Sequence, residues 1–355
     1  MALLSPDVDV HILDTTLRDG SYANDFQFTV GQTKSLCRAL EKSGIPLIEV
    51  GHGVGLNAGN AGYRSAIATD EEYMQAASEA CEESMWGMFC IPGVATIEDV
   101  RLAGEYGMDF IRIGTNISEV EESREFIEVA KEEGMFVTAN YMKSYARPPE
   151  TFAEKAAQSK TYGADLVYLV DSAGGMLPRT LRSYVNAADK GIDIPLGFHG
   201  HDNLGLAVAN SLIMADAGVF VVDTSLQGLG RSAGNASTEK VIASLEKSGY
   251  DTGTDFLQLL RAGQRFVNPI RENPSQMPLD VIAGREEFHS SHMTKILDAA
   301  YEYGIDPAHL IHAVCVENKI YAPEDLVKEL AASLDSNKGG TIQDYGLARY
   351  PGSEE

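Results

Sequence analysis

Short apolar runs rich in valine and isoleucine recur roughly every 25 to 40 residues along this chain. After each of the eight runs, apolar residues return at the three- and four-residue spacing of an amphipathic helix. Runs of this kind are typical of strands in parallel sheets, which are covered on both faces. The predicted strands span residues 10–14, 47–51, 86–91, 110–114, 136–141, 166–171, 196–201 and 220–226.

The stretches between these runs are predicted to be helices, several of them followed by a glycine in the position of a C-cap. They span residues 30–43, 70–83, 97–106, 119–133, 149–162, 178–190, 204–217 and 238–248. Eightfold alternation of strand and helix favours an α/β fold closed as a (β/α)8 TIM barrel. An open doubly wound sheet is the alternative. No G-x-G-x-x-G motif follows the first strand, which argues against an open sheet that binds a dinucleotide.

The pattern changes after about residue 252, where helices follow one another without strands. We expect helices over 256–267, 289–303, 307–316 and 323–333, with a break rich in proline and asparagine around 268–278. The predicted organisation is therefore a barrel over residues 9–252, a C-terminal helical portion over 253–336 packed on the barrel, and a polar tail over 337–355 that we expect to fray.

Composition narrows the class of protein. The chain has 355 residues, 44% of them hydrophobic, which supports a sizeable core. A net charge of −24 argues against a nucleic-acid surface, because phosphates would be repelled. No signal-like start and no long apolar stretch is evident, and Cys37, Cys81, Cys90 and Cys315 form no C-x-x-C pair. We therefore expect reduced thiols, no membrane association and a cytoplasmic location.

Polar residues gather where four predicted strands end, and the active site of a TIM barrel lies at the C-terminal ends of its strands. The first strand leads into T-T-L-R-D-G at 15–20, and the sixth ends in D-S-A-G-G at 171–175. The seventh ends in F-H-G-H-D-N at 198–203, and the eighth leads to G-L-G-R-S-A-G-N at 228–235. These four stretches contain the candidate chemistry.

His199 and His201 are two residues apart on an extended segment, so their side chains point to one face and can ligate a single ion. Asp19 adds a carboxylate and completes a set of two imidazoles and one carboxylate that leaves positions open for substrate and water. An H-x-H pair can also consist of one polar and one core histidine. Its position at a strand end favours a metal site.

Three further residues have more than one interpretation. Arg18 is either a buried partner of a barrel carboxylate such as Glu49 or a guanidinium that stabilises an enolate oxygen or holds a carboxylate. Ser172 and the glycines after it form either a tight turn or a site for a substrate carboxylate. Asn235, in a glycine-rich loop, is a turn residue, a partner of a metal ligand or a fourth ligand.

Together these motifs resemble the family that contains the 2-isopropylmalate and homocitrate synthases, hydroxymethylglutaryl-CoA lyase and 4-hydroxy-2-oxovalerate aldolase. The matching strings are T-L-R-D-G at 16–20, D-S-A-G-G at 171–175, H-G-H-D-N-L-G-L-A-V-A-N-S at 199–211 and G-L-G-R-S-A-G-N-A at 228–236. V-G-H-G at 50–53 and a short helical C-terminal portion are most similar to the aldolase branch, because the synthases usually carry a longer extension.

The resemblance implies a ligand set and two substrate contacts. Asp19, His199 and His201 would bind Mn²⁺ or Mg²⁺. Arg18 would stabilise the pyruvate enolate, and Ser172 would help to hold the 2-oxo acid.

Two positions depart from the aldolase pattern. Those aldolases have a histidine directly after R-D-G-S, proposed as the base for the C4 hydroxyl, where this chain has Tyr22. They have a tyrosine before a Ser-Ser pair near the start of the helical portion, where this chain has His289. Our hypothesis is an exchange in which His289 is the base and Tyr22 supplies a hydrogen bond, because imidazole titrates near neutrality and phenol near ~10. Alternatively, His289 caps or packs a helix and the specificity differs.

The predicted function is a divalent-metal-dependent aldolase, a carbon–carbon lyase that cleaves or forms a 4-hydroxy-2-oxo acid, with pyruvate and an aldehyde as products. No Schiff-base lysine is required, and Lys143 is interpreted as a solvated loop charge. The alternatives are a Claisen-type acyl-CoA-dependent 2-oxo acid synthase and a non-catalytic barrel. The resemblance also implies a partner, an acylating aldehyde dehydrogenase, and a homo-oligomer is compatible with it.

Overall fold

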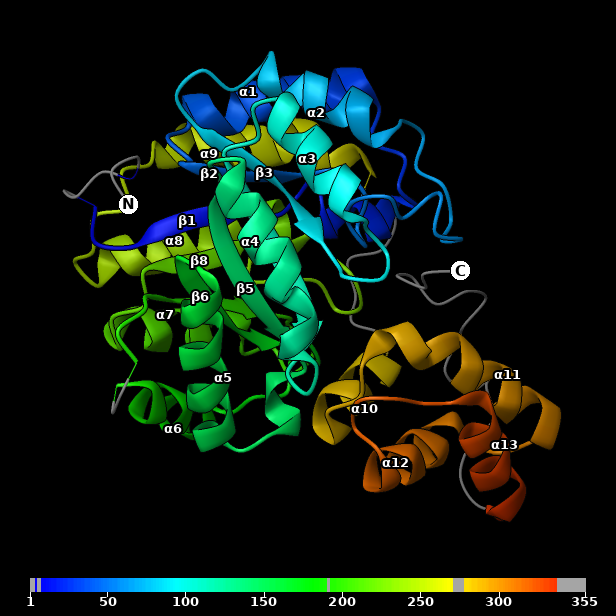
Figure 1. Cartoon of the computed structure of the whole chain (residues 1–355). Coiled ribbons are helices and arrows are strands. Elements are labelled where there is room, and N and C mark those ends of the chain that lie inside the picture. Colours follow the sequence, from blue (N-terminus) through cyan, green and yellow to red (C-terminus); the bar gives the residue numbers. More distant parts are fainter. Residues whose placement is uncertain (1–3, 5–7, 190–191, 271–277, 337–355) are drawn as a thin grey trace.

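Eight parallel strands close into a barrel in the order β1 to β8, with β8 paired to β1 (Figure 1). The computed structural model describes residue 4 and residues 8–189, 192–270 and 278–336. The predicted (β/α)8 TIM barrel is confirmed, and each predicted strand is present with ends shifted by at most two residues. The strands are β1 (His11–Asp14), β2 (Leu47–Val50), β3 (Met85–Cys90), β4 (Phe110–Asn116), β5 (Phe136–Met142), β6 (Leu166–Asp171), β7 (Leu196–Gly200) and β8 (Val221–Thr224).

One helix follows each strand and covers the outside of the barrel. Capping boxes begin three of the helices, at Thr29, Thr69 and Thr96, where a threonine side chain and the residue three positions later satisfy each other's backbone N–H groups. The helices are α1 (Val30–Lys42), α2 (Asp70–Ser78), α3 (Ile97–Glu105), α4 (Arg124–Glu132), α5 (Pro149–Tyr162), α6 (Pro178–Ala188), α7 (Ala207–Asp216) and α8 (Thr238–Lys247).

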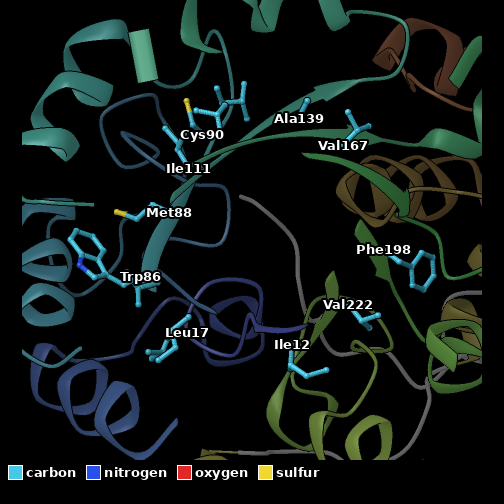
Figure 2. Packing of buried hydrophobic residues seen from close by; sticks show 14 of the residues in the cluster. Ile12, Leu17, Trp86, Met88, Cys90, Ile111, Ala139, Val167, Phe198 and Val222 are labelled. Carbon is cyan, nitrogen blue, oxygen red and sulfur yellow. The ribbon is translucent and has the colours of Figure 1, made fainter. Parts of the chain in front are cut away.

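Alternate residues of each strand enter two different layers of packing. Residues such as Ile12, Met88 and Phe198 pack in the large apolar layer between strands and helices (Figure 2). Residues next to members of this layer, such as Leu13 beside Ile12 and Leu47 beside Ile48, form a smaller cluster with residues of the other strands. The apolar layer fixes the strands and therefore the positions of the side chains at their ends.

The inward-facing layer also contains buried charges. Arg112 of β4 is fully buried, and its Nη1 donates to Oε2 of Glu49 in β2 at 2.9 Å. Its Nη2 is hydrogen-bonded to Asp223 of β8. A buried charge is tolerated when it is paired and hydrogen-bonded. This pairing links three strands directly beneath the strand ends.

The C-terminal helices divide between two cores. Helix α9 (Phe256–Ala262) and the π-helical turn Gly263–Val267 place Leu259 and Val267 in the core of the barrel. The later helices share a second core, which includes Leu279 and Leu310. They are α10 (Pro278–Glu286), α11 (Met293–Tyr303), α12 (Pro307–Glu317) and α13 (Glu324–Ser333). Helix α10 is absent from the sequence prediction, and the predicted tail lies outside the described residues.

The division of the chain at residues 252 and 253 stays a prediction. In the part of the chain that the structure describes, no helix combines the length and apolar character needed to span a bilayer.

Candidate active site

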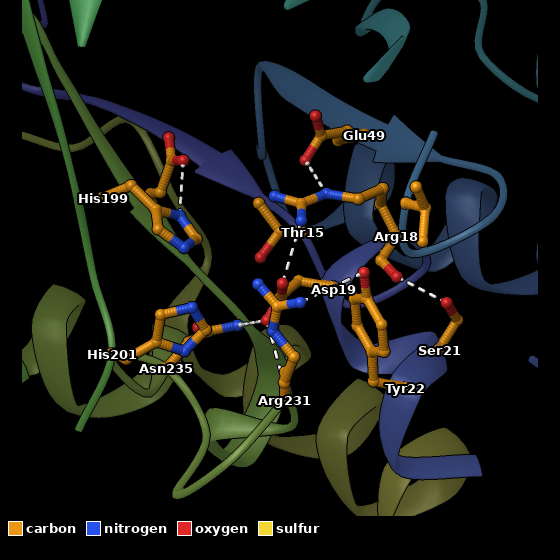
Figure 3. Close-up of polar contacts among 12 residues, drawn as sticks. Thr15, Arg18, Asp19, Ser21, Tyr22, Glu49, His199, His201, Arg231 and Asn235 are labelled. Carbon is orange, nitrogen blue, oxygen red and sulfur yellow. Dashed lines mark hydrogen bonds and ion pairs between the residues drawn. The ribbon is translucent and has the colours of Figure 1, made fainter. Parts of the chain in front are cut away.

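Asp19, His199 and His201 converge where β1 and β7 end (Figure 3). Their ligand atoms all lie within 4.8 Å of one another, and all three side chains are buried. Gly200 lies between the two histidines. A side chain there would crowd the Phe198 ring, because a Cβ atom would be 2.8 Å from it. The extended backbone thus directs both imidazoles to one face, as the H-x-H spacing predicted.

A hydrogen bond at Nδ1 orients each imidazole. Nδ1 of His199 is 2.9 Å from Oδ2 of Asp223, and Nδ1 of His201 is 3.2 Å from the carbonyl oxygen of Gly234. Both partners are acceptors, so each Nδ1 donates to its partner and Nε2 is the nitrogen left to ligate an ion. Burial also lowers the pKa of His201 to about 3, so this imidazole is neutral at physiological pH.

Asp19 is held as a carboxylate from two sides. Oδ1 accepts from Nη1 of Arg18 at 2.9 Å, and Oδ2 accepts from Nδ2 of Asn235 at 2.7 Å. Burial acts to raise the pKa of this carboxyl, but the charge of Arg18, assisted by His201, outweighs burial and holds the pKa well below its usual range. The site therefore contains a fixed negative ligand beside the two imidazoles.

Arg18 is paired with a barrel carboxylate, as one of its two sequence interpretations has it, and it also faces the cavity. Its Nε donates to Oε2 of Glu49 at 2.7 Å, which makes it a buried partner of that carboxylate. It also lines the cavity beside Asp19, with its guanidinium carbon 4.9 Å from the centre of the Phe89 ring. A planar cation fixed in this way is oriented before any substrate binds.

These contacts form one series across the barrel, in which basic and acidic side chains alternate. We call it the polar chain. Its members, in order of contact, are His199, Asp223, Arg112, Glu49, Arg18 and Asp19.

The residues present fit a divalent cation. Two imidazole nitrogens and a carboxylate are a donor set that such ions accept. Within the described structure, Oδ1 of Asn235 is buried and has no hydrogen-bond partner, as expected of an oxygen that faces a cation. The glycine-rich loop makes room for this arrangement, because a Cβ on Gly230 would lie 2.4 Å from Nδ2 of Asn235 and 2.8 Å from Oδ2 of Asp19.

A cavity of about 210 Å³ opens above these ligands. Ser172, after β6, lines it and accepts the backbone N–H of Lys143 at 2.9 Å, which leaves its own hydroxyl hydrogen to donate to another group. Gly174 adopts a left-handed backbone, and a Cβ on Gly175 would lie 2.1 Å from the carbonyl oxygen of Gly284. The glycines therefore form a turn, and Ser172 also faces the cavity.

The interpretation of Lys143 as a solvated charge is wrong. Its side chain is buried in the cavity wall, and Nζ donates to the carbonyl oxygen of Ile320 at 2.7 Å. Nζ also lies 5.5 Å from the centre of the Tyr321 ring. The segment before α13 thus covers a lysine that sequence spacing placed at an exposed loop.

The outer part of the cavity contains Tyr22, Arg231 and His289, which we call the mouth cluster. Nη2 of Arg231 is 2.9 Å from Nε2 of His289, and Nη1 is 3.4 Å from the hydroxyl of Tyr22. The guanidinium carbon also lies 4.7 Å from the centre of the Tyr22 ring (Figure 3). The two positions that depart from the aldolase pattern are therefore bridged by one arginine, which sequence reasoning did not single out.

His289 makes a capping contact and also lines the cavity. It precedes the 3-10 turn Ser290–His292, and its Nδ1 accepts the backbone N–H of Ser291 at 3.3 Å, which is a capping contact. Its other nitrogen faces the cavity. Burial, reinforced by the charges of Arg231 and Lys143, holds the pKa of His289 well below its ordinary value, so the imidazole is neutral with a lone pair directed at Arg231.

The barrel and this arrangement of side chains define a TIM-barrel protein whose strand ends bring together residues that can hold a divalent cation. A family model described as HMGL-like matches residues 9–266, and the chain belongs to that family. It is 35% identical over 332 residues to 4-hydroxy-2-oxovalerate aldolase of Moorella thermoacetica, covering 93% of this chain and 98% of that one. It is 36% identical to 4-hydroxy-2-oxovalerate aldolase of Pelotomaculum thermopropionicum, and the match covers 94% of this chain and 98% of that one.

Solved structures give the same fold. The N-terminal domain of a putative aldolase from Bacteroides vulgatus matches with a TM-score of 0.66 at 25% identity, over 79% of this chain and 94% of that chain. The carboxyl transferase domain of Rhizobium etli pyruvate carboxylase matches with a TM-score of 0.76 at 18% identity. The match covers 92% of this chain and 60% of that chain, and it shows the fold alone. The predicted resemblance and the predicted class, an aldolase of the carbon–carbon lyase type, are confirmed.

Proposed function

We propose that this enzyme cleaves a 4-hydroxy-2-oxo acid between C3 and C4, giving pyruvate and an aldehyde, and forms the same bond in reverse. The observation that carries the proposal is the convergence of Asp19, His199 and His201 beside the guanidinium of Arg18 at the base of one cavity. The relatives named as 4-hydroxy-2-oxovalerate aldolases support the substrate class.

Asp19, His199 and His201 would hold Mn²⁺ or Mg²⁺, with Oδ1 of Asn235 available as a further donor. When bound, such a cation polarises a carbonyl group as a Lewis acid. The protein's part is to orient both imidazoles, through the hydrogen bonds at Nδ1, and to keep the carboxylate ionised, through the charge of Arg18.

Arg18 and Ser172 would bind the pyruvate half of the substrate. The hydroxyl of Ser172 can donate to the C1 carboxylate, because its oxygen already accepts from the backbone of Lys143. The guanidinium of Arg18 would stabilise the negative charge that develops on the C2 oxygen as C3 becomes the carbon of an enolate. This charge forms in a buried site, where a fixed cation is worth more than in water.

His289 would accept the proton of the C4 hydroxyl at Nε2, replacing its contact with Arg231. The C3–C4 bond then breaks, and its electrons pass to the pyruvate half as the C4–oxygen bond becomes the carbonyl of the departing aldehyde. Protonation at C3 completes pyruvate. Tyr22 would donate a hydrogen bond to the same oxygen. The bridge through Arg231 supports the exchange of roles, since it brings both side chains to one part of the cavity.

One assay tests the proposed function. Protein loaded with Mn²⁺ is incubated with racemic 4-hydroxy-2-oxo acids of different chain length while pyruvate is followed, and separately with 2-oxo acids plus acetyl-CoA while free thiol is followed. We expect pyruvate in the first reaction and its loss after treatment with a chelator. Thiol release without pyruvate would replace the proposal with a Claisen-type synthase, and neither product would indicate a non-catalytic barrel.

We also propose that an acylating aldehyde dehydrogenase receives the aldehyde. Support comes only from the resemblance to the aldolase branch. Copurification of the two proteins, or their comigration on a sizing column, is the expected result. Failure of a purified dehydrogenase of this class to bind the enzyme would count against the partner and leave the aldolase activity untouched.

A further inference from the structure

We infer that Asn140 is a substrate-binding residue, whose side-chain N–H groups donate to the C1 carboxylate of the pyruvate half from the floor of the cavity. The inference rests on the proposed function and deepens it, because it adds a donor to the site that Arg18 and Ser172 would form. Sequence reasoning did not single out Asn140, which lies within β5 rather than after a strand end.

The side chains inside the barrel close it beneath the cavity. In a TIM barrel, each interior layer takes its side chains from alternate strands. Arg112 joins one such layer, which comes from the even-numbered strands. It is hydrogen-bonded to Glu49 and Asp223. Its guanidinium carbon also lies 4.5 Å from the centre of the Tyr168 ring. These four side chains fill the barrel below the proposed site.

Asn140 belongs to the next layer, which comes from the odd-numbered strands. The first residues of β3, β5 and β7 that line the cavity, counted toward the strand ends, are Phe89, Asn140 and His199. Strand ends face the mouth of the cavity, so these three residues are the deepest lining residues of their strands. The carboxamide of Asn140 is therefore level with the imidazole of His199, one of the proposed cation ligands.

The carboxamide is oriented with its N–H groups toward the cavity. Its Oδ1 accepts the hydroxyl hydrogen of Thr138 at 3.0 Å, from the residue two positions earlier on the same face of β5. Asn140 is 2% exposed and lines the cavity. Among the described residues, no group accepts a hydrogen bond from its Nδ2. Buried donors are normally satisfied, so this amide is suited to a partner that enters with the substrate.

The position of Asn140 in the barrel selects the C1 carboxylate. Ser172 is on the neighbouring strand side, where its Oγ accepts the backbone N–H of Lys143, three residues after Asn140. Arg18 and Asp19 follow β1, which lies across the closed barrel from β5. A 2-oxo acid whose C2 oxygen faces Arg18 therefore turns its carboxylate toward Ser172 and Asn140. One carboxylate can accept from both, because it has about four lone-pair sites.

Calorimetry with pyruvate on the Mn²⁺-loaded protein tests this contact without requiring any cleavage. Asn140→Leu keeps a similar size but removes the donors, and we expect the dissociation constant for pyruvate to rise about ten- to a hundredfold. Asn140→Asp should weaken binding at least as much, because a carboxylate there also repels that of pyruvate. The controls Asn186→Leu and Asn186→Asp, at an exposed position on α6, should leave pyruvate affinity unchanged.

Thr138→Val tests the orientation of the amide while Asn140 stays in place. It removes the hydroxyl that holds Oδ1 and keeps the shape of the side chain. We expect a smaller loss of pyruvate affinity, of a few-fold. Mn²⁺ affinity should stay within a few-fold of wild type in every variant, which separates the loss of a substrate contact from damage to the cation site.

Kinetics identify the oxygen that Asn140 contacts. The C1 carboxylate keeps its charge throughout the reaction, so loss of a donor to it should raise KM with little change in kcat. A fall in kcat with unchanged pyruvate affinity would assign Asn140 to the enolate oxygen and overturn the inference.

The binding measurement also separates this inference from the proposed function. Wild-type pyruvate affinity in both Asn140 variants would overturn the inference while the aldolase function stands. Pyruvate binding that depends on Asn140, in a protein that cleaves no 4-hydroxy-2-oxo acid, would uphold the contact and refute the proposed function. A wild-type protein that binds no pyruvate would overturn both.

Discussion

The two ends of the cavity are built differently. The inner end consists of Asp19, His199 and His201, and each of these side chains is held by a partner from the barrel or its loops. The mouth cluster, by contrast, combines residues from three separate segments, one of them beyond the barrel. Under the proposed function, the residues that would hold the cation are positioned by the strand ends, whereas the residues that would face the aldehyde come from loops and the C-terminal helical portion.

The largest effect is expected from His201→Ala at the inner end. Removing one of three ligands should abolish tight Mn²⁺ binding and lower pyruvate release by about a thousandfold or more, because a Lewis acid supplies several kcal/mol of stabilisation. Metal content and kcat measure this. The control His309→Ala, exposed on α12, should change neither. A His201→Ala protein that retains one equivalent of Mn²⁺ would contradict the assignment of the inner end.

His289→Ala should lower kcat by about a hundredfold to ten-thousandfold, the range of a lost general base. Mn²⁺ affinity should stay within a few-fold of wild type, which distinguishes the mouth cluster from the inner end. Calorimetry with Mn²⁺ and a pyruvate-release assay give the two quantities. Unaltered cleavage of a 4-hydroxy-2-oxo acid would eliminate the exchange of roles.

The double variant Tyr22→His with His289→Tyr sharpens the same prediction. If the two side chains have exchanged places, the double variant should recover part of the activity that each single variant loses, with a coupling of about 0.5–3 kcal/mol. Strictly additive losses would indicate that the two positions act independently.

Asp223→Asn should weaken Mn²⁺ binding by about 10- to 100-fold, since the carboxylate sets the orientation and tautomer of His199. It should also lower the melting temperature, because Arg112 loses one of its two buried counter-charges. Asp216→Asn, at an exposed carboxylate on α7, is the matched control. Wild-type Mn²⁺ affinity in Asp223→Asn would show that the inner end needs no such support.

The smallest effect concerns pH. Burial and the charge of Arg231 hold the pKa of His289 well below 6.5, so kcat/KM should show no acid limb near that value. A positive neighbour disfavours the imidazolium, and in Arg231→Leu the pKa of His289 should therefore rise and the acid limb should move to higher pH. A pH–rate profile checks this. An unchanged profile would mean that the two groups are not coupled.

Much of the barrel could be predicted because its signal is local. Strand composition and helical spacing repeat eight times, and the inner end follows from residues at strand ends. Helix α2 ends at Ser78 rather than at the predicted residue 83 for a reason that periodicity does not contain. The carboxylate of Glu41 accepts the backbone N–H groups of Glu82, Glu83 and Ser84 and holds this segment in another conformation.

The mouth cluster could be predicted only in part. Tyr22 and His289 were found because they depart from a motif, but the contact of each with Arg231 spans 209 and 58 residues of sequence. Lys143 looked exposed because its partner, the carbonyl of Ile320, is 177 residues away. Helix α10 begins at a proline after a break rich in proline and asparagine, and its packing with Leu310 and other residues of the second core is tertiary.

The polar chain also bears on protein engineering. Each of its charged members faces an oppositely charged neighbour, so replacing one of them leaves a charge buried without compensation, at a cost of about 3–5 kcal/mol. A designer who grafts only the two imidazoles and the aspartate onto another barrel would transfer the ligands without the side chains that aim them. A faithful transplant needs His201 together with the six side chains of the polar chain, which come from β2, β4, β7, β8 and the loop after β1.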